Sequence, residues 1–470
     1  MIEDVWPPIQ LTYLSTYLEQ IGCKTLLIEG HYVDRDYVED MAIFYARSLR
    51  AYPPYCQRMH FFKESFDDAA WRALLVRANN GNGESARMWL QDAYLGFSVI
   101  RPLPGSPIGR TVVATFGPDA SEGRHREFEG IRDYAAHIGG LDLHVRGLAF
   151  QQQDQGVSAC ATIALWSAVH RVAPLEGLAV MTPAQITEAA SRYYLPGGRS
   201  LPSEGLTVNQ MCEAIRAAGL APIVIPATSP ERDRAQLLGY MRSGFAPVLA
   251  AETLTDRQGH AVCAVGAKLG PVKPQTNAAL AYRDGATALE GLYIHDDRLG
   301  PYAAADIYPF TENGTTRTAL RIRWPGSKDE EEHLLVRAIV VPAPAKIRLT
   351  VARMRSLGIP LANAVGVLLG SPVNLDCRYD MASSYRARAF QFDLTDDGVF
   401  TLGHGLVFSR YIGLIEISDD EGPLLDLVLD ATETVANPSV LACVARRRFD
   451  AAATEAFTYL SSQLAAAFVS

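Results

Sequence analysis

The stretch Asp154-Gln155-Gly156-Val157-Ser158-Ala159-Cys160 runs directly into the apolar segment Ala161-Thr162-Ile163-Ala164-Leu165-Trp166-Ser167-Ala168-Val169. This pattern predicts a helix that begins at Cys160. The N-terminal end of a helix favours the thiolate form of a cysteine, and its first backbone N–H groups are free to bind an oxyanion. The side-chain amide of Gln155 can reach the same oxygen. The stretch therefore predicts a nucleophile, Cys160, with an oxyanion donor, Gln155.

A second segment carries a histidine at the beginning of an expected strand, Gly259-His260-Ala261-Val262-Cys263-Ala264-Val265-Gly266. Strand alternation places His260 on the same face as Val262 and Ala264, and Cys263 on the opposite face. A neutral imidazole can take the proton of Cys160 and keep the thiolate as half of an ion pair. We therefore expect His260 to act as the general base and acid.

A third segment, Leu292-Tyr293-Ile294-His295-Asp296-Asp297-Arg298-Leu299-Gly300, is an apolar strand that ends in two carboxylates and a turn. A carboxylate here can accept a hydrogen bond from the imidazole nitrogen that does not face the sulfur, which orients the ring and stabilises the imidazolium. Strand parity groups Asp296 with Leu292 and Ile294 on one face. This grouping favours Asp296 as the orienting residue, with Asp297 as the alternative.

In this order, the three segments resemble the papain-like cysteine peptidase superfamily. The Gln-Gly run before Cys160 and the residues from His260 to Gly266 are similar to the papain motifs. An Asp in the third segment, together with the compact spacing, resembles the bacteriocin-processing (double-glycine leader) peptidases and their relatives. The resemblance covers about residues 147–305. It implies that Gln155 is the oxyanion donor, Cys160 the nucleophile, His260 the base and acid, and Asp296 the orienter.

Two positions depart from the pattern of that family. Ala161 follows the nucleophile where papain has Trp and the leader peptidases have Gly, which alters the wall of the cleft. Gln155 lies one residue nearer to the cysteine than in papain, and Gln151, Gln152 and Gln153 precede it. Gln153 is therefore the alternative oxyanion donor.

The composition is that of a globular, multi-domain protein, with 470 residues of which 48% are hydrophobic and 20% charged. A net charge of −9 with scattered basic residues argues against binding to nucleic acid. The seven cysteines form no CxxC pair, so we expect free thiols, no metal site and a reducing cytoplasm. No apolar run is long enough to span a membrane, and the first residues do not have the pattern of a signal peptide.

The order of expected elements predicts an α+β fold, with the nucleophile helix packed on an antiparallel sheet. Capping boxes at Thr182 and Thr207 begin two further helices, and a strand at 221–225, a helix at 233–242 and a strand at 246–251 follow. We expect three domains: a mixed N-terminal region at 1–140, the papain-like domain at 141–345, and a mixed C-terminal region at 346–470. The segment 270–289 is inserted between the strands of His260 and Asp296, and the sequence does not indicate its role.

The flanking regions are also expected to be mixed α/β. The expected elements are helices at 11–21 and 37–49, a hairpin of strands at 95–102 and 109–116, a helix at 351–369, strands at 411–417 and 424–429, and a last helix at 453–468. These regions are candidates for recognising substrate, for holding the enzyme inactive or for binding a regulatory protein partner.

The sequence thus predicts a cytoplasmic hydrolase, a cysteine (thiol) protease that cleaves a peptide or isopeptide bond in a protein or peptide substrate without a cofactor. The Cys-His-Asp triad would form a thioester acyl-enzyme. One alternative is a cysteine-dependent acyltransferase, similar to transglutaminases, because these use the same order of residues. Another is a non-catalytic peptide-binding module on the same fold.

Overall fold

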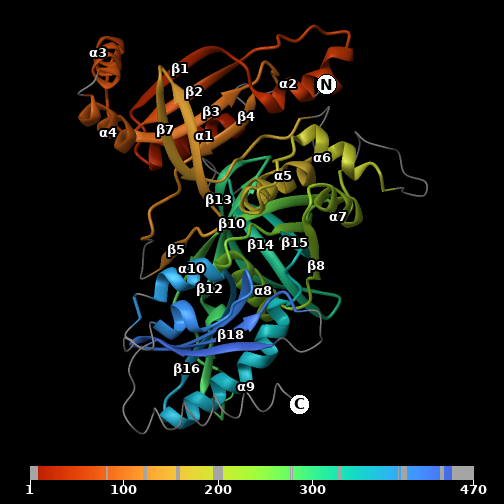
Figure 1. The fold of residues 1–470 in the computed structure, drawn as a ribbon. Helices are drawn as coiled ribbons and strands as arrows, with labels where there is room; N and C mark the ends of the chain where they lie inside the picture. The colour runs from red at the N-terminus through yellow and green to blue at the C-terminus, as the bar shows by residue number, and fades with distance from the viewer. Residues whose placement is uncertain are drawn as a thin grey trace.

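The computed structural model describes residues 9–80, 83–119, 124–154, 159–193, 205–275, 277, 279–324, 331–389, 391–392, 400–433 and 439–446. These residues form a mixed fold of helices and largely antiparallel sheets, which confirms the expected fold class at this level. Figure 1 shows the N-terminal elements at the top, the central elements in the middle and the C-terminal elements at the bottom. Within the described ranges, no helix is both long enough and apolar enough to cross a membrane.

The centre of the molecule is a closed barrel of six strands. In order around the barrel, the strands are β12 (Leu289–Asp296), β13 (Gly300–Glu312), β14 (Thr315–Arg323), β15 (Glu331–Ala343), β9 (Val248–Thr253) and β10 (Gly259–Leu269). The barrel closes because β10 pairs with β12 as well as with β9. Two further strands extend the sheet, β8 (Ala221–Pro226) beside β15 and β5 (His125–Glu127) beside β10. Closure removes the free edges that an open sheet would leave.

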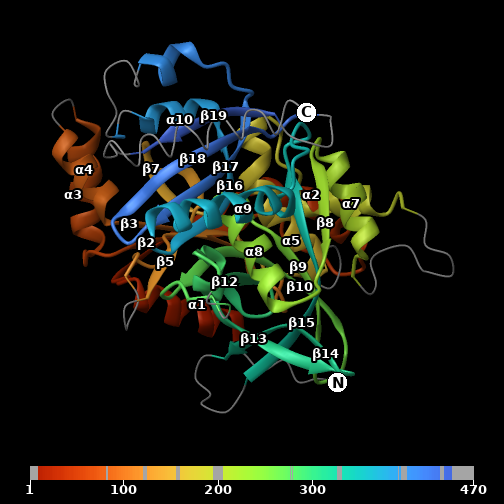
Figure 2. The same ribbon diagram turned by 90° about the horizontal axis from the view of Figure 1, so that it is seen from below.

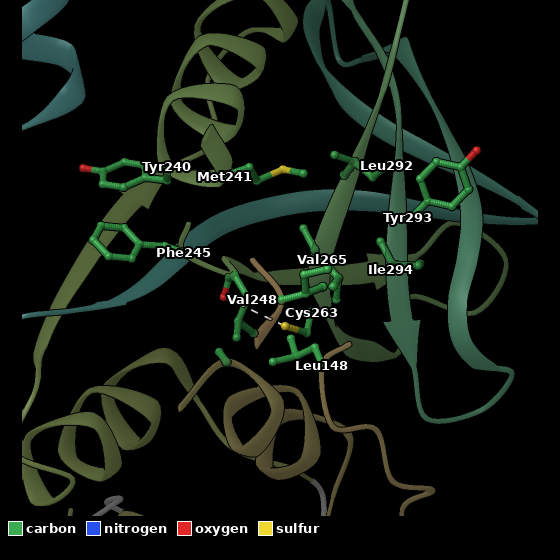
Figure 3. Packing of buried hydrophobic residues seen from close by; sticks show 14 of the residues in the cluster. Leu148, Tyr240, Met241, Phe245, Val248, Cys263, Val265, Leu292, Tyr293 and Ile294 are labelled. Carbon is green, nitrogen blue, oxygen red and sulfur yellow. Dashed lines mark hydrogen bonds between the residues drawn. The ribbon is translucent and has the colours of Figure 1, made fainter. Parts of the chain in front are cut away.

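The helix α5 (Cys160–Val172) packs against β10 of the barrel. Nearly all of its residues after Cys160 are buried, which explains why the segment is apolar on every side. The helices α6 (Pro183–Ala190) and α7 (Val208–Ala217) pack beside α5, and each begins with the capping box that the sequence predicts. Figure 3 shows the core near α5, where Leu148, Val248 and Cys263 meet.

The N-terminal region contains the four-stranded sheet β1-β2-β3-β4. Its elements are α1 (Ile9–Gln20), β1 (Thr25–Tyr32), α2 (Arg35–Ile43), β2 (Cys56–Phe62), α3 (Asp68–Asn79), α4 (Glu84–Ala93), β3 (Tyr94–Ile100) and β4 (Ile108–Val113). The expected hairpin is confirmed, because β3 and β4 pair antiparallel. The helix expected at 37–49 is shorter than expected: α2 ends at Ile43, and a 3₁₀ turn follows at Tyr45–Arg47. Leu49 continues the apolar spacing but is fully exposed, so no packing sustains the helix there.

The hairpin of β6 (Arg132–Ile138) and β7 (Leu141–Gly147) surrounds the boundary expected near residue 140. Its turn, Gly139 and Gly140, has positive φ at both residues. The strand β7 packs on β3 and β4 of the N-terminal sheet. Beyond Gly147 the chain enters the segment that leads to Cys160, so the N-terminal sheet and the nucleophile segment are directly connected.

The C-terminal region is a five-stranded sheet with the order β11-β16-β17-β18-β19. Its elements are β16 (Val373–Met381), β17 (Tyr411–Asp419), β18 (Gly422–Asp430), β19 (Val440–Ala445), α9 (Val351–Leu369) and α10 (Ala382–Ala389). Figure 2 shows α9 beside this sheet and near α8 (Pro230–Arg242) of the central region. The helix expected at 453–468 lies outside the described residues.

The segment at 270–289, which the sequence does not explain, contributes to this C-terminal sheet. Its strand β11 (Tyr282–Asp284) pairs in parallel with β16. The contact with α9 is close, since a Cβ atom at Gly366 would lie 1.8 Å from the carbonyl oxygen of Ala281. The central region therefore supplies one strand of the C-terminal sheet.

We expect Gly147→Ala to lower the free energy of unfolding. In a strand, alanine is normally favoured over glycine by about 0.5–1 kcal/mol. A Cβ atom at Gly147, however, would lie 2.6 Å from the carbonyl oxygen of Val113 and 2.9 Å from the hydroxyl of Tyr302. We expect this crowding to dominate and to destabilise the protein by about 1–3 kcal/mol. Denaturant unfolding would measure the change.

The matched control is Gly30→Ala, because a Cβ atom there would have no neighbour within 4 Å. This variant should be as stable as the wild type or slightly more stable. If Gly147→Ala matched Gly30→Ala, the close contact between β7 and Tyr302 would be refuted.

Candidate active site

The barrel brings His260 and Asp296 together although they are far apart in the sequence. His260 is near the beginning of β10, and Asp296 is the last residue of β12. The two strands pair antiparallel, with Cys263 opposite His295, so the beginning of one lies beside the end of the other. The register between β12 and β13 shifts between Ile294 and Asp296, and such irregularities redirect side chains at the ends of strands.

The imidazole of His260 forms a buried pair with the carboxylate of Asp296. Nε2 of His260 lies 3.0 Å from Oδ1 of Asp296 and donates the hydrogen bond. The two residues are only 5% and 1% exposed. The backbone N–H of Arg298 donates to the same Oδ1 at 3.0 Å, which fixes the carboxylate from its other side. Since Nε2 is occupied, Nδ1 is the nitrogen that remains for another partner.

The thiol that interacts with this imidazole is that of Cys160, the first residue of α5. Its side chain is half-buried, and its hydrogen-bonding interaction with the imidazole contributes to raising the pKa of His260. The helix packs on β10 and contacts β12 as well, so the position of the sulfur depends on the barrel strands that carry the other two residues. The structure thus brings together Cys160, His260 and Asp296.

The surroundings of His260 favour the charged imidazolium. Burial by itself lowers the pKa of His260, and the charge and hydrogen bond of Asp296 are the main effects that oppose it. The hydrogen bond of Cys160 and the charge of Asp297 act in the same direction, so that the pKa lies well above its ordinary value of about 6.5. An imidazolium that persists above neutral pH can stabilise a thiolate beside it.

The two adjacent carboxylates differ in their environments. Burial acts to raise the pKa of Asp296, but the charge and hydrogen bond of His260, assisted by Arg298, lower it below the ordinary value. Burial, together with the charge of Asp296, raises the pKa of Asp297 to about 7. Asp296 is therefore the ionised partner of His260. Asp297 is 3% exposed, and its Oδ2 has no hydrogen-bond partner within the described part of the chain.

The expected oxyanion donor, Gln155, lies outside the described residues. The structure does describe the three glutamines that precede it, at positions 151, 152 and 153. Gln152 uses both ends of its amide to hold the β3–β4 connection, through the N–H of Ile108 and the carbonyl of Gly105. Gln153 is half-buried. The amide nitrogen of Gln151 is buried and has no hydrogen-bond partner among the described residues. Gln151 is therefore a second alternative oxyanion donor beside Gln153, and the sequence does not single it out.

Arg101 anchors the segment before Cys160. Its guanidinium is buried, donates to the carbonyl oxygens of Ser106 and Gln152 at 2.8 and 3.0 Å, and lies 3.5 Å from the carboxylate of Asp154. Its contacts with Gln152 and Asp154 were missed because they join residues about fifty positions apart.

The remaining thiols differ from Cys160 in their surroundings. Burial raises the pKa of five of them: Cys23, Cys56, Cys212, Cys263 and Cys377. Cys263 is the extreme case, since it is fully buried in the core near α5 and donates a weak hydrogen bond to the carbonyl of Ala246, drawn as a dashed line in Figure 3. These five thiols are poor candidates for a nucleophile.

His260, Asp296 and Asp297 are also the one group in the described residues whose side chains could together hold a metal ion. One ligand atom from each lies within 4.8 Å of the others. However, Nε2 of His260 and Oδ1 of Asp296 already bind each other at 3.0 Å. A cation that used these two atoms would have to break their hydrogen bond, so the geometry fits a proton-bearing pair better than a metal site.

Comparison with known proteins does not identify the chain. No family model matches the sequence, and a search of the curated proteins gives no match. The chemistry of the site must therefore be inferred from its residues.

We expect Asp296→Asn to lower the pKa of His260, because the variant removes the main charge that opposes the effect of burial. Asp297→Asn should have a smaller effect, since the charge of Asp297 contributes less than that of Asp296 to the raised pKa of His260. NMR titration of the His260 ring would measure both shifts. Equal shifts in the two variants would contradict the assignment of Asp296 as the charged partner.

The same pair makes stability depend on pH. Folding raises the pKa of His260. The contribution of this histidine to the free energy of unfolding is therefore complete below about pH 6.5, and it is lost as the pH rises through the pKa that His260 has in the folded protein. The lowered pKa of Asp296 stabilises the fold above the unfolded value of about 3.9, and this effect is lost as the pH falls.

Proposed function

We propose that the protein is a cysteine peptidase that hydrolyses a peptide or isopeptide bond through a thioester acyl-enzyme. The observation that carries the proposal is the buried His260–Asp296 pair, 3.0 Å apart, beside the thiol that begins α5. A structural histidine does not require a buried carboxylate on one nitrogen and a half-exposed thiol on the other. Such an arrangement suits a nucleophile whose proton must move during turnover.

In the first half of the reaction, the thiolate of Cys160 would attack the carbonyl carbon of the substrate. The resulting oxyanion would be bound by the backbone N–H of Cys160, which belongs to the first turn of α5 and has no partner within the helix. Collapse of this intermediate breaks the C–N bond, and His260 gives its Nδ1 proton to the leaving amine. The products are a free amine and a thioester at Cys160.

In the second half, the neutral imidazole of His260 would take a proton from water. The hydroxide attacks the thioester carbon, the C–S bond breaks, and the carboxylic acid leaves. The imidazolium of His260 then forms the ion pair with the thiolate of Cys160 that has been released. Asp296 remains ionised throughout and stabilises the imidazolium in both halves.

The arrangement that supports a papain-like assignment is the helix bearing Cys160 packed on a closed, antiparallel barrel that bears His260 and Asp296. The substrate on this proposal is a protein or peptide, and the reaction requires no cofactor. A cytoplasmic location agrees with the free state of the seven cysteines but is part of the proposal.

We expect Cys160→Ala to abolish hydrolysis without altering the fold, because the variant removes the atom that forms the thioester. Activity would be measured on a peptide library at neutral pH, and folding by circular dichroism. Cys263→Ala is the matched control: it removes a buried thiol without a role in the reaction and should keep its activity, although the small cavity costs stability. Full turnover by Cys160→Ala would refute the mechanism.

Transglutaminase-like enzymes also pass through a thioester, so a second experiment is needed to distinguish hydrolysis from acyl transfer. It traps the acyl-enzyme of the wild type. Acid-quenched samples are analysed by mass spectrometry for an acyl group on Cys160, with and without added amine. A thioester that water resolves supports the peptidase, whereas one that only an amine resolves supports the acyltransferase. A peptide that binds without forming any thioester would favour the binding module.

One glutamine before Cys160 should complete the oxyanion site. We expect Gln155→Ala to lower kcat by about 10²–10³-fold with little change in KM, because an oxyanion donor acts mainly in the transition state. Gln153→Ala and Gln151→Ala test the two alternatives. Gln152→Ala is the control that should affect stability more than kcat, because this side chain holds Ile108 and Gly105. If Gln155→Ala kept its full kcat, the assignment would pass to whichever alternative lowers it.

A further inference from the structure

The N-terminal helix α1 lies against the turn that follows the candidate catalytic aspartate. Nε2 of Gln10 lies 3.4 Å from the carbonyl oxygen of Asp297, to which it donates, and the hydroxyl of Tyr13 donates to the carbonyl of Pro301 at 3.1 Å. These contacts join residues nearly 290 positions apart. They bind the turn at its two ends, while Asp296 immediately precedes it.

The ring of Tyr13 occupies a space that a glycine leaves free. A Cβ atom at Gly300 would lie 2.1 Å from Cδ1 of Tyr13, closer than any real contact allows. The pKa of Tyr13 is raised by burial and then by the charge of Asp296, which shows that the phenol lies within the field of that carboxylate. Tyr13 therefore packs on the turn at its closest point.

A second tyrosine, Tyr302, continues this support on the far side of Gly300. It is fully buried and has a φ of 55°, a left-handed conformation that a non-glycine residue adopts only when its surroundings impose it. Its ring stacks on Tyr17 of α1 with centroids 5.6 Å apart. Its hydroxyl donates to the carbonyl of Val113 at 3.2 Å and accepts from the N–H of Leu148 at 2.8 Å.

These contacts connect three segments around the candidate site. Leu148 belongs to the segment that leads to Cys160, Tyr302 to the strand after the turn, and Tyr17 to α1. Tyr17 itself donates to the carbonyl of Ala114 at 2.7 Å, which ties α1 to the end of β4. Figure 2 shows α1 close to β13, the strand that begins at Gly300.

We propose that α1 is part of the catalytic apparatus, with Tyr13 as a positioning residue that holds the turn between Asp296 and Tyr302 so that Asp296 faces His260. This inference rests on the proposed function and gives the N-terminal region a role in it. Tyr13 touches neither substrate nor the reacting atoms, and it acts through the carbonyl of Pro301 and the surface of Gly300.

The predicted consequence is a change in how readily Cys160 reacts. If the turn moves, Asp296 supports the imidazolium of His260 less well, and the imidazolium in turn supports the thiolate less well. Alkylation of Cys160 should then require a higher pH. We expect the acid limb of its pH profile to move upward by about one pH unit.

The test is the rate of alkylation of Cys160 by iodoacetamide in the full-length protein, measured between pH 4 and pH 10 by mass spectrometry of the Cys160 peptide. Tyr13→Phe removes only the bond to Pro301, and Gly300→Ala displaces the ring. In the double variant Tyr13→Ala/Gly300→Ala, the shift should equal that of Tyr13→Ala alone, because no ring is left to displace. Such non-additivity would not follow from two independent losses of stability.

Two variants serve as controls. Tyr94→Phe removes the hydroxyl of another buried tyrosine in the N-terminal region, one that bonds to His60 and not to the turn. Thr12→Ala alters an exposed position of α1. Both should keep the profile of the wild type.

The possible results separate the inference from the proposed function. Upward shifts in the Tyr13 and Gly300 variants, with none in the controls, support the role of α1. If wild-type Cys160 reacts faster than free cysteine while these variants match the controls, the role of α1 is refuted and the triad is retained. If wild-type Cys160 reacts no faster than free cysteine at any pH, the proposed function itself fails, and the inference fails with it.

Discussion

The hydrogen bond between His260 and Asp296 is the interaction on which the rest of this site depends. Two buried groups that can each carry a charge are expensive to remove from water unless they neutralise each other. At 3.0 Å, each stabilises the charged form of the other, and the N–H of Arg298 completes the shell of the carboxylate. The barrel makes this possible because its closure places the beginning of β10 beside the end of β12. The charge retained on His260 is then available to the thiol at the beginning of α5.

Much of the central region could be predicted from local patterns. The apolar run after Cys160, the two capping boxes and the alternation after His260 each act over a few residues, and the corresponding elements are present. Strand parity favours Asp296 over Asp297 as the orienting residue. In the structure, most of β12 is buried on both faces, so parity alone does not separate the two carboxylates by burial. They differ because Asp296 reaches His260, whereas Oδ2 of Asp297 has no hydrogen-bond partner among the residues that the structure describes.

The features that could not be predicted depend on long-range packing. Nothing near Tyr13 in the sequence indicates that its ring covers Gly300, and the left-handed backbone of Tyr302 is imposed by partners on α1, β4 and the segment before Cys160. The same holds for β11, whose partner β16 lies about ninety residues away. The helix expected to continue to residue 49 ends early for the opposite reason, since Leu49 is fully exposed. Domain boundaries drawn from composition do not reveal such shared strands and contacts.

The central claim is that Cys160 is activated by His260, and site-resolved labelling of Cys160 at neutral pH tests it most directly. A thiol-reactive peptide probe is applied to the wild type and to His260→Ala, and the labelled fraction of Cys160 is measured by mass spectrometry after equal times. We expect rapid labelling of the folded wild type and a loss of about 10²-fold or more in His260→Ala. Equal labelling of Cys160 in the two folded proteins would contradict it.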